Sequence, residues 1–132
     1  MANIAEQIVD MLVKAGVKRI YAVTGDSLNK INDAVRKDGR IQWIHVRHEE
    51  TGAFAAGAEA QLHGDLACCA GSSGPGHVHL INGLYDAHRS GAPVLAIAST
   101  IISGEFGTTY FQETGTIRLF DDCSYYNQLA KI

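Results

Sequence analysis

The sequence lacks a cluster of basic residues, a long apolar run and a spaced set of cysteines. Its 132 residues carry a formal net charge of −3, and the 11 lysines and arginines are scattered. We therefore expect neither nucleic acid nor an anionic membrane surface as a partner. No apolar run approaches the length of a bilayer span, and no basic segment followed by an apolar one opens the chain. These absences predict a soluble, cytoplasmic protein without a transmembrane segment.

The thiols and imidazoles do not form a familiar metal or disulfide pattern. Two of the three cysteines, Cys68 and Cys69, are neighbours, and adjacent cysteines bridge only with strain, so reduced thiols are expected. The closest histidine pairs are His45–His48 and His77–His79. No spaced cysteine or carboxylate set completes a tetrahedral site around either pair, so the sequence predicts no metal site.

Three nucleotide or nucleophile motifs are also absent. The segment Gly71–Gly76 has the glycine spacing of a phosphate-binding loop, but His77 and Val78 replace the lysine and the hydroxyl residue. The turn at 24–29 does not supply the glycines of a dinucleotide fingerprint. Pro75 replaces the last glycine of a nucleophile elbow. Nucleotide hydrolysis, a Rossmann site and serine hydrolysis are therefore disfavoured.

What the sequence does contain is an alternation of short apolar strands with helices. A first helix is expected between Asn3, which has Glu6 three residues on as in a capping box, and Gly16 as a stop. The predicted strands are 19–23, 41–46, 66–70 and 93–98, and the later helices are a segment ending near Arg36, 49–63 and 77–89. This order predicts an α/β fold of three layers, with a central, mostly parallel sheet and helices on both faces.

Ligands of such a sheet bind at the carboxyl ends of its strands, and two segments lie there. Glu49 is expected where a strand meets a helix of small residues, and it is either a helix cap or a reactive carboxylate. The glycine-rich turn 71–76 is either a tight connection or a place of close ligand approach. The loop 99–116 is expected to form a wall of the same site.

The chain ends soon after this loop. Residues 125–132 have strand character, and no further helix or strand follows to cover the sheet. The fold is therefore expected to be truncated at its C-terminal end, with an open sheet edge and some exposed apolar surface.

Five motifs, in their order and spacing, resemble the pyrimidine-binding domain of thiamine-diphosphate enzymes. The resemblance covers almost the whole chain and is greatest to the branch of pyruvate oxidase and quinone-dependent pyruvate dehydrogenase, with acetolactate synthase as a near relative. The motifs are Val23–Asn29, Arg47–Glu50, Gly71–Gly76, Asn82–Ala87 and Phe111–Glu113.

This resemblance implies roles for particular residues. Glu49 corresponds to the glutamate that hydrogen-bonds the ring nitrogen of the aminopyrimidine and so starts catalysis. His79, Phe111 and Gln112 correspond to residues on the substrate side. The residues implied to bind the cofactor are Glu49, Gly25, Asp26, Ser73, Gly74, Pro75, Gly76 and His79.

The resemblance also implies a larger enzyme. The parent protein would use thiamine diphosphate, magnesium and FAD to decarboxylate pyruvate oxidatively to acetate or acetyl phosphate. It would be a cytoplasmic homo-oligomer, a dimer or tetramer, that could contact a membrane quinone through other regions. The family's Gly-Asp-Gly signature for diphosphate and magnesium is absent here, as is the FAD-binding middle domain. Residues 1–132 are therefore expected to be one incomplete pyrimidine-binding domain that is inactive alone.

Two alternatives remain at this stage. The parent could be a carboligase similar to acetolactate synthase, because Glu49 and the glycine turn serve any member of the superfamily. The chain could instead be a short domain without catalysis that dimerises or binds a partner.

Overall fold

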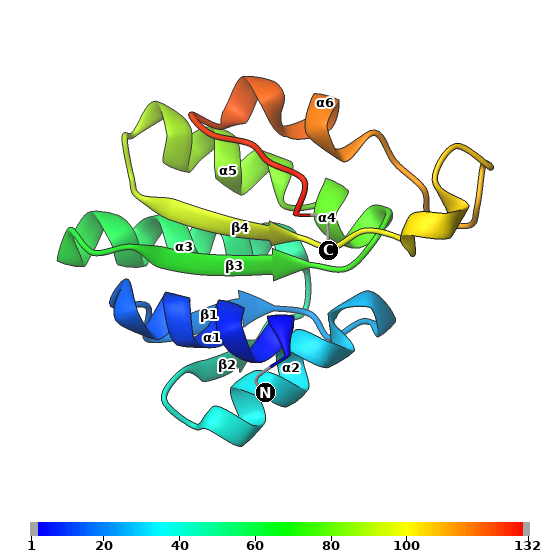
Figure 1. Ribbon diagram of the computed structural model, residues 1–132. Coiled ribbons are helices and arrows are strands. Elements are labelled where there is room, and N and C mark those ends of the chain that lie inside the picture. Colours follow the sequence, from blue (N-terminus) through cyan, green and yellow to red (C-terminus); the bar gives the residue numbers. More distant parts are fainter. Residues whose placement is uncertain (1–2, 131–132) are drawn as a thin grey trace.

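Four short parallel strands form one sheet in the computed structural model, which describes residues 3–130 (Figure 1). The strands are β1 (Arg19–Ala22), β2 (Gln42–His45), β3 (Ala67–Gly71) and β4 (Val94–Ala98), and their order is β2-β1-β3-β4. Helices lie on both faces of the sheet, so the α/β fold expected from the sequence is confirmed. All pairings between the strands are parallel.

Of the two central strands of the sheet, β1 and β3, the strand β3 has the smaller side chains. All five residues of β3 are buried, and Cys68 pairs in register with Ile20 of β1 and Leu95 of β4. The cysteines are free, and burial raises the pKa of the Cys69 thiol to about 12. Central parallel strands are covered on both faces and therefore read as continuous apolar runs. The edge strand β2, by contrast, is exposed at both of its ends.

One face of the sheet is covered by α1 (Ile4–Lys14) and α2 (Asn29–Asp38). Asn3 caps α1 through the expected capping box with Glu6, and α2 ends at Gly39, whose φ of 74° is left-handed. A short 3₁₀ turn, η1 (Asp26–Leu28), precedes α2. The buried core of this face is formed by Ala5, Val9, Leu12, Val17, Ile20, Ala22, Leu28, Ala34, Val35, Ile41, Cys68 and Ala70.

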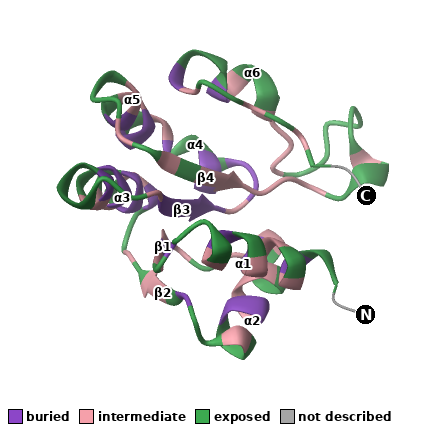
Figure 2. Cartoon of the chain, turned by 60° about the vertical axis from the view of Figure 1, so that its left-hand side comes forward, coloured by how far each residue is buried: buried purple, intermediate pink, exposed green. Residues whose placement is uncertain are grey.

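The opposite face is covered by α3 (Glu49–His63) and α5 (Ile81–Arg89). These helices approach closely because small residues line their contact: a Cβ atom placed at Gly83 would lie 2.5 Å from Cβ of Ala53. Farther along the chain, α6 (Thr116–Phe120) and the 3₁₀ turn η3 (Asp121–Cys123) add Phe120 and Cys123 to this second core. Figure 2 shows β3 buried along its length and further buried segments in the helices on both faces of the sheet.

Two predicted elements differ from the structure. The helix expected at 77–89 begins earlier and is interrupted: α4 (Pro75–Val78) and α5 are separated by His79 and Leu80. Proline suits the first helical position, which explains the early start. The strand character expected at 125–132 is wrong for residues 125–130, which form no strand, and residues 131–132 lie outside the described part of the chain.

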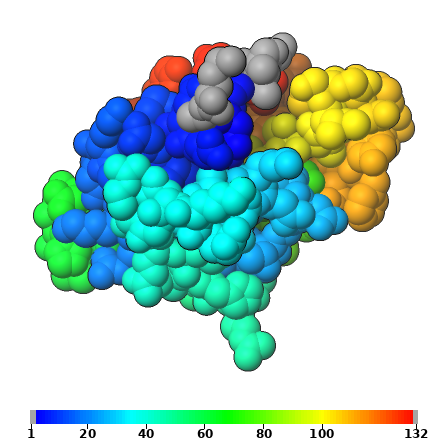
Figure 3. All heavy atoms as spheres, turned by 60° about the horizontal axis from the view of Figure 1, so that its bottom comes forward, coloured from blue at the N-terminus to red at the C-terminus, as the bar shows by residue number. Residues whose placement is uncertain are grey.

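The loop expected at 99–116 runs as irregular chain with one 3₁₀ turn, η2 (Ser103–Glu105). Figure 3 shows its yellow and orange atoms as a bulge beside the blue and cyan helices of the first face. On that face Leu95 of β4 is exposed, and the outer edge of β4 pairs with no described strand. Among the described residues, no helix combines the length and apolar character needed to span a membrane.

Candidate functional site

The candidate site lies at the carboxyl edge of the sheet, beside the two central strands. At this point successive strands are added on opposite sides of the sheet. From β1 the chain moves to β2 on one side, and from β3 it moves to β4 on the other. Such a switch point opens a crevice for ligands between the two central strands. Gly25 follows β1 and Ser72 follows β3, and a Cβ atom at Gly25 would lie 2.5 Å from Cβ of Ser72. The close approach of these two turns therefore requires glycine at position 25.

Glu49 is the buried carboxylate of this edge. It is the first residue of α3 and only 8% exposed. His48, not Glu49, caps the helix, since its Nδ1 accepts a hydrogen bond from the backbone N–H of Glu50 at 3.3 Å. Oε2 of Glu49 instead lies 2.9 Å from Nδ1 of His79. The carboxylate thus joins α3 to the segment between α4 and α5. The N-terminal end of α3 also favours its negative charge.

The second oxygen of Glu49 faces the glycine-rich turn. Oε1 makes no hydrogen bond with a described residue, and a Cβ atom at Gly76 would lie 3.3 Å from it. Gly71 and Gly74 have a different reason to be glycine. A Cβ at Gly71 would lie 2.5 Å from the backbone oxygen of Gly76, and Gly74 has a φ of 70°. The tight connection therefore explains Gly71 and Gly74. A Cβ atom at Gly76 would also lie 2.6 Å from Oγ of Ser72, so glycine at this position accommodates both Ser72 and the Glu49 carboxylate.

A hydrogen-bond chain joins three loops around this turn. The backbone N–H of Ser73 donates to Oγ of Ser27 at 2.9 Å, and Oγ of Ser73 donates to Oε1 of Gln112 at 3.1 Å. Oγ of Ser99 donates to the backbone oxygen of Ser27 at 2.8 Å. Gln112 has a φ of 66°, which is unusual for a residue other than glycine and is held by these contacts.

Some of the candidate residues of this edge are exposed to solvent. Phe111 is 79% exposed, and Asp26 and Pro75 are also exposed. Gly25, Ser73, Gly74, Gly76, His79 and Gln112 do converge on the edge that holds Glu49.

His77 lies at this edge, and the sequence analysis assigned it no role in the site. Its side chain is almost fully buried, Nδ1 donates to the backbone oxygen of Ser99 at 2.8 Å, and Nε2 accepts from Oγ1 of Thr114 at 2.6 Å. It therefore ties α4 to the end of β4 and to the loop that carries Gln112. Burial lowers the pKa of His77, so the imidazole is neutral at pH 7. A histidine within a turn of small residues was the only sequence signal for this role.

His77 predicts a loss of stability in acid. Because its pKa is lower in the folded than in the unfolded chain, the unfolded chain takes up the proton first as pH falls. The stabilisation is thus complete above about pH 6.5, the ordinary histidine pKa, and is lost as pH falls toward the folded pKa. Urea unfolding at pH 7.5 and 5.5 should show a larger loss of unfolding free energy for the wild type than for His77→Gln. The same loss in both proteins would contradict this role, and His63→Gln is the exposed control.

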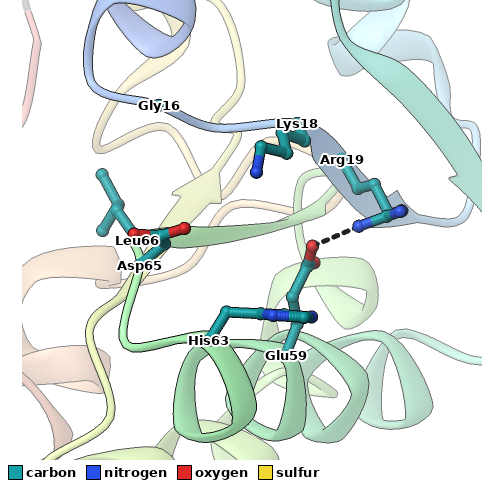
Figure 4. A pocket seen from close by; sticks show the side chains of 7 residues that line it. All are labelled: Gly16, Lys18, Arg19, Glu59, His63, Asp65 and Leu66. Carbon is teal, nitrogen blue, oxygen red and sulfur yellow. Dashed lines mark hydrogen bonds and ion pairs between the residues drawn. The ribbon is translucent and has the colours of Figure 1, made fainter.

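A hollow lies at the opposite, amino-terminal edge of the sheet (Figure 4). Its cavity of about 140 Å³ contains the ion pair between Arg19 and Glu59, whose atoms lie 2.6 Å apart. Lys18 and Asp65 add charges of both signs, and His63 also lines the cavity. Neither the glycine turn nor Glu49 reaches this cavity, so the carboxyl edge remains the candidate for chemistry.

The carboxyl edge presents one carboxylate with its two oxygens in different surroundings. A buried carboxylate with one oxygen fixed by His79 and one facing Gly76 presents a hydrogen-bonding group of set orientation to a ligand. Glycines on the opposing turn allow the ligand to approach the backbone closely.

Comparison with known proteins points to one family. The family model for the thiamine pyrophosphate enzyme, N-terminal TPP binding domain, matches residues 2–119. An uncharacterized 42.6 kDa protein from Pseudomonas amyloderamosa is 62% identical over 98% of the chain. Pyruvate oxidase of Lactiplantibacillus plantarum is 43% identical over 93% of the chain, and the chloroplastic acetolactate synthase 3 of Brassica napus is 32% identical over 96%.

The chain spans a third or less of the length of these curated relatives. It covers 33% of the Pseudomonas protein, 21% of the pyruvate oxidase and 19% of the acetolactate synthase.

Proposed function

Because the chain belongs to the family of N-terminal TPP-binding domains of thiamine pyrophosphate enzymes, we propose that its Glu49 hydrogen-bonds the aminopyrimidine ring of thiamine diphosphate. The observation that carries this proposal is the difference between the two carboxylate oxygens of Glu49. Oε2 is held by His79, whereas Oε1 faces Gly76 and has no partner among the described residues. A side chain at position 76 would fill the space beside Oε1.

The chain's own residues then position the ring and move one proton. When bound, thiamine diphosphate supplies a thiazolium carbon that becomes nucleophilic after losing its proton. Glu49 shares a proton with the pyrimidine nitrogen, and His79 keeps the carboxylate turned toward the ring. Gly74 and Gly76 let the backbone of the turn approach the ring face, while Gly25, Asp26, Ser73 and Pro75 border the cofactor.

For the substrate, we propose pyruvate, with His79, Phe111 and Gln112 on the substrate side. Gln112 is oriented for this by Ser73, and Phe111 is exposed and free to contact further protein or substrate. The proposed reaction of the whole protein is oxidative decarboxylation to acetate or acetyl phosphate with FAD. The 43% identity to a pyruvate oxidase supports this choice. The 32% identity to an acetolactate synthase favours a carboligase as the second candidate.

Diphosphate, magnesium and FAD would be held outside these 132 residues, by other regions or by a partner chain. We assign the residues named above to the pyrimidine half of the cofactor. We further propose that the active protein is a homo-oligomer, since a cofactor bound between domains of two subunits requires at least a dimer.

The test uses the native protein, recovered from its source cells with an antibody against this chain, so that any further domain or partner is retained. Given pyruvate, thiamine diphosphate and magnesium, it should consume pyruvate and reduce a bound flavin. Acetolactate formation without flavin reduction would select the carboligase. A native mass of 14.2 kDa with no pyruvate consumption would contradict both enzymes and favour the interaction domain.

The isolated chain of 132 residues should be inactive. With thiamine diphosphate, magnesium, FAD and pyruvate it is expected to release no acetate above the rate without protein, because it lacks groups for the diphosphate. Enzymatic acetate determination checks this, with the native protein as the positive control. Sustained acetate formation by the isolated chain would contradict the proposed division between domains.

A further inference from the structure

We propose that His48, Glu49 and His79 bind a divalent transition-metal ion such as Zn²⁺ at the candidate site. Each residue offers one ligand atom, and the three atoms lie within 4.8 Å of one another. Two imidazoles and a carboxylate are the donor set of many zinc sites that keep a fourth position for water. The sequence predicted no metal, because it paired His45 with His48 and His77 with His79. The fold instead brings His48 of one segment beside His79 of another.

The three ligands are held by a rigid contact between two elements. His48 and Glu49 begin α3, and His79 stands between α4 and α5. The close packing of α3 on α5 through Gly83 fixes the distance between the two segments. Oε2 of Glu49 and Nδ1 of His79 are already 2.9 Å apart. One edge of the coordination shell is therefore formed before any ion arrives.

The third ligand requires a small rearrangement. The imidazoles of His48 and His79 are stacked, with ring centres 4.2 Å apart and planes inclined by 27°. Zinc bonds of about 2.0–2.1 Å place tetrahedral ligand atoms about 3.3 Å apart, so the stack must open until both nitrogens point at the ion. Rotation about χ2 of histidine is soft. The side chains are 46% and 41% exposed, and no described residue bonds Nε2 of either ring. A turn of either ring would exchange its Nδ1 hydrogen bond, with the N–H of Glu50 or with Oε2 of Glu49, for a bond to the ion.

The charge at the site suits a cation. Glu49 contributes a carboxylate, and Oε2 of Glu50 lies 3.8 Å from Nδ1 of His48. The nearest thiols, by contrast, are buried in β3, and their pKa values are raised by that burial, so they do not compete for the ion. An ion bound here would occupy the carboxylate that the proposed function assigns to the pyrimidine. Inhibition by the metal is therefore the consequence if that function holds, and only this consequence rests on it.

The experiment measures metal binding alone. Isothermal titration calorimetry of the tag-free 132-residue chain with Zn²⁺ is expected to give one site per chain. His48→Asn, which retains an N-cap side chain, and His79→Gln should each weaken binding at least about tenfold. His63→Ala, at the far end of α3, should bind as the wild type does. Wild-type affinity in both site variants, or loss of binding in His63→Ala, would overturn the proposal.

A second measurement identifies the ligand type and guards against misfolding. Co²⁺ bound at this site should give visible d–d absorption without the intense charge-transfer band of a thiolate ligand. A thiolate band would place the ion at a cysteine and overturn the proposal. Circular dichroism verifies that each variant is folded before titration. Since no thiamine diphosphate is present, failure of the metal site leaves the proposed function untouched, and the reverse also holds.

Discussion

Glu49→Gln is expected to slow exchange of the thiazolium proton of thiamine diphosphate by about 10²–10⁴-fold in the native protein that carries this chain. The magnitude is that of a general acid–base group, because glutamine keeps the size of the side chain but cannot share a carboxyl proton with the pyrimidine nitrogen. Pyruvate turnover should fall by a similar factor, since the loss lies in the first chemical step. Proton exchange followed by NMR after quenching measures the first quantity, and pyruvate consumption measures the second.

The neighbouring residue provides the matched control. Glu50 lies in the same helical turn, and its Oε1 accepts a hydrogen bond from Nδ2 of Asn82 at 2.8 Å at the surface. Glu50→Gln removes the same charge from the start of α3, and the Glu50 side chain makes no hydrogen bond with Glu49 or His79 among the described contacts. The rate of thiazolium proton exchange in this variant should lie within a few-fold of the wild-type rate. Equal rates for Glu49→Gln and Glu50→Gln would remove Glu49 from the chemistry.

Gly83→Ala is expected to lower the free energy of unfolding by about 2 kcal/mol or more, although alanine is the better helix former. The new Cβ would lie 2.5 Å from Cβ of Ala53 and 2.6 Å from the backbone nitrogen of Phe54. The second contact is with backbone, which cannot turn aside, so α5 must move away from α3. That movement would also separate His79 from Glu49. Urea unfolding of the isolated chain measures the change.

Gly57→Ala is the control on the same helix contact. Its new Cβ would lie 3.5 Å from Cβ of Ala87, an ordinary packing distance, and the substitution should gain up to about 1 kcal/mol from helix propensity. The two substitutions are therefore predicted to change the free energy of unfolding in opposite directions. If Gly83→Ala left stability unchanged or raised it, the close approach of α3 and α5 would be refuted.

The sequence was a good guide where local chemistry determines structure. The capping box at Asn3 and Glu6, the small-residue helix from Glu49 to His63 and its end at Gly64 all appear as expected. Strand positions were predicted within a residue or two, because buried parallel strands are short apolar runs bounded by turns. The resemblance to thiamine-diphosphate enzymes agrees with the family match over residues 2–119.

Contacts between distant segments were beyond prediction. Nothing local distinguishes His77, which joins Ser99 and Thr114, from a surface histidine, because its partners lie 22 and 37 positions further along the sequence. The stacking of His48 on His79 likewise exists only after α3 and α5 have packed. The strand expected after Tyr125 failed because apolar character alone does not supply a pairing partner. Tyr125 and Tyr126 are instead exposed.

The most direct test of the central claim is a crystal structure of the native protein with thiamine diphosphate bound. The account predicts that a carboxylate oxygen of Glu49 lies within about 3 Å of the pyrimidine ring nitrogen, with the ring beside Gly76. A pyrimidine ring bound elsewhere, with Glu49 still paired only to His79, would contradict it.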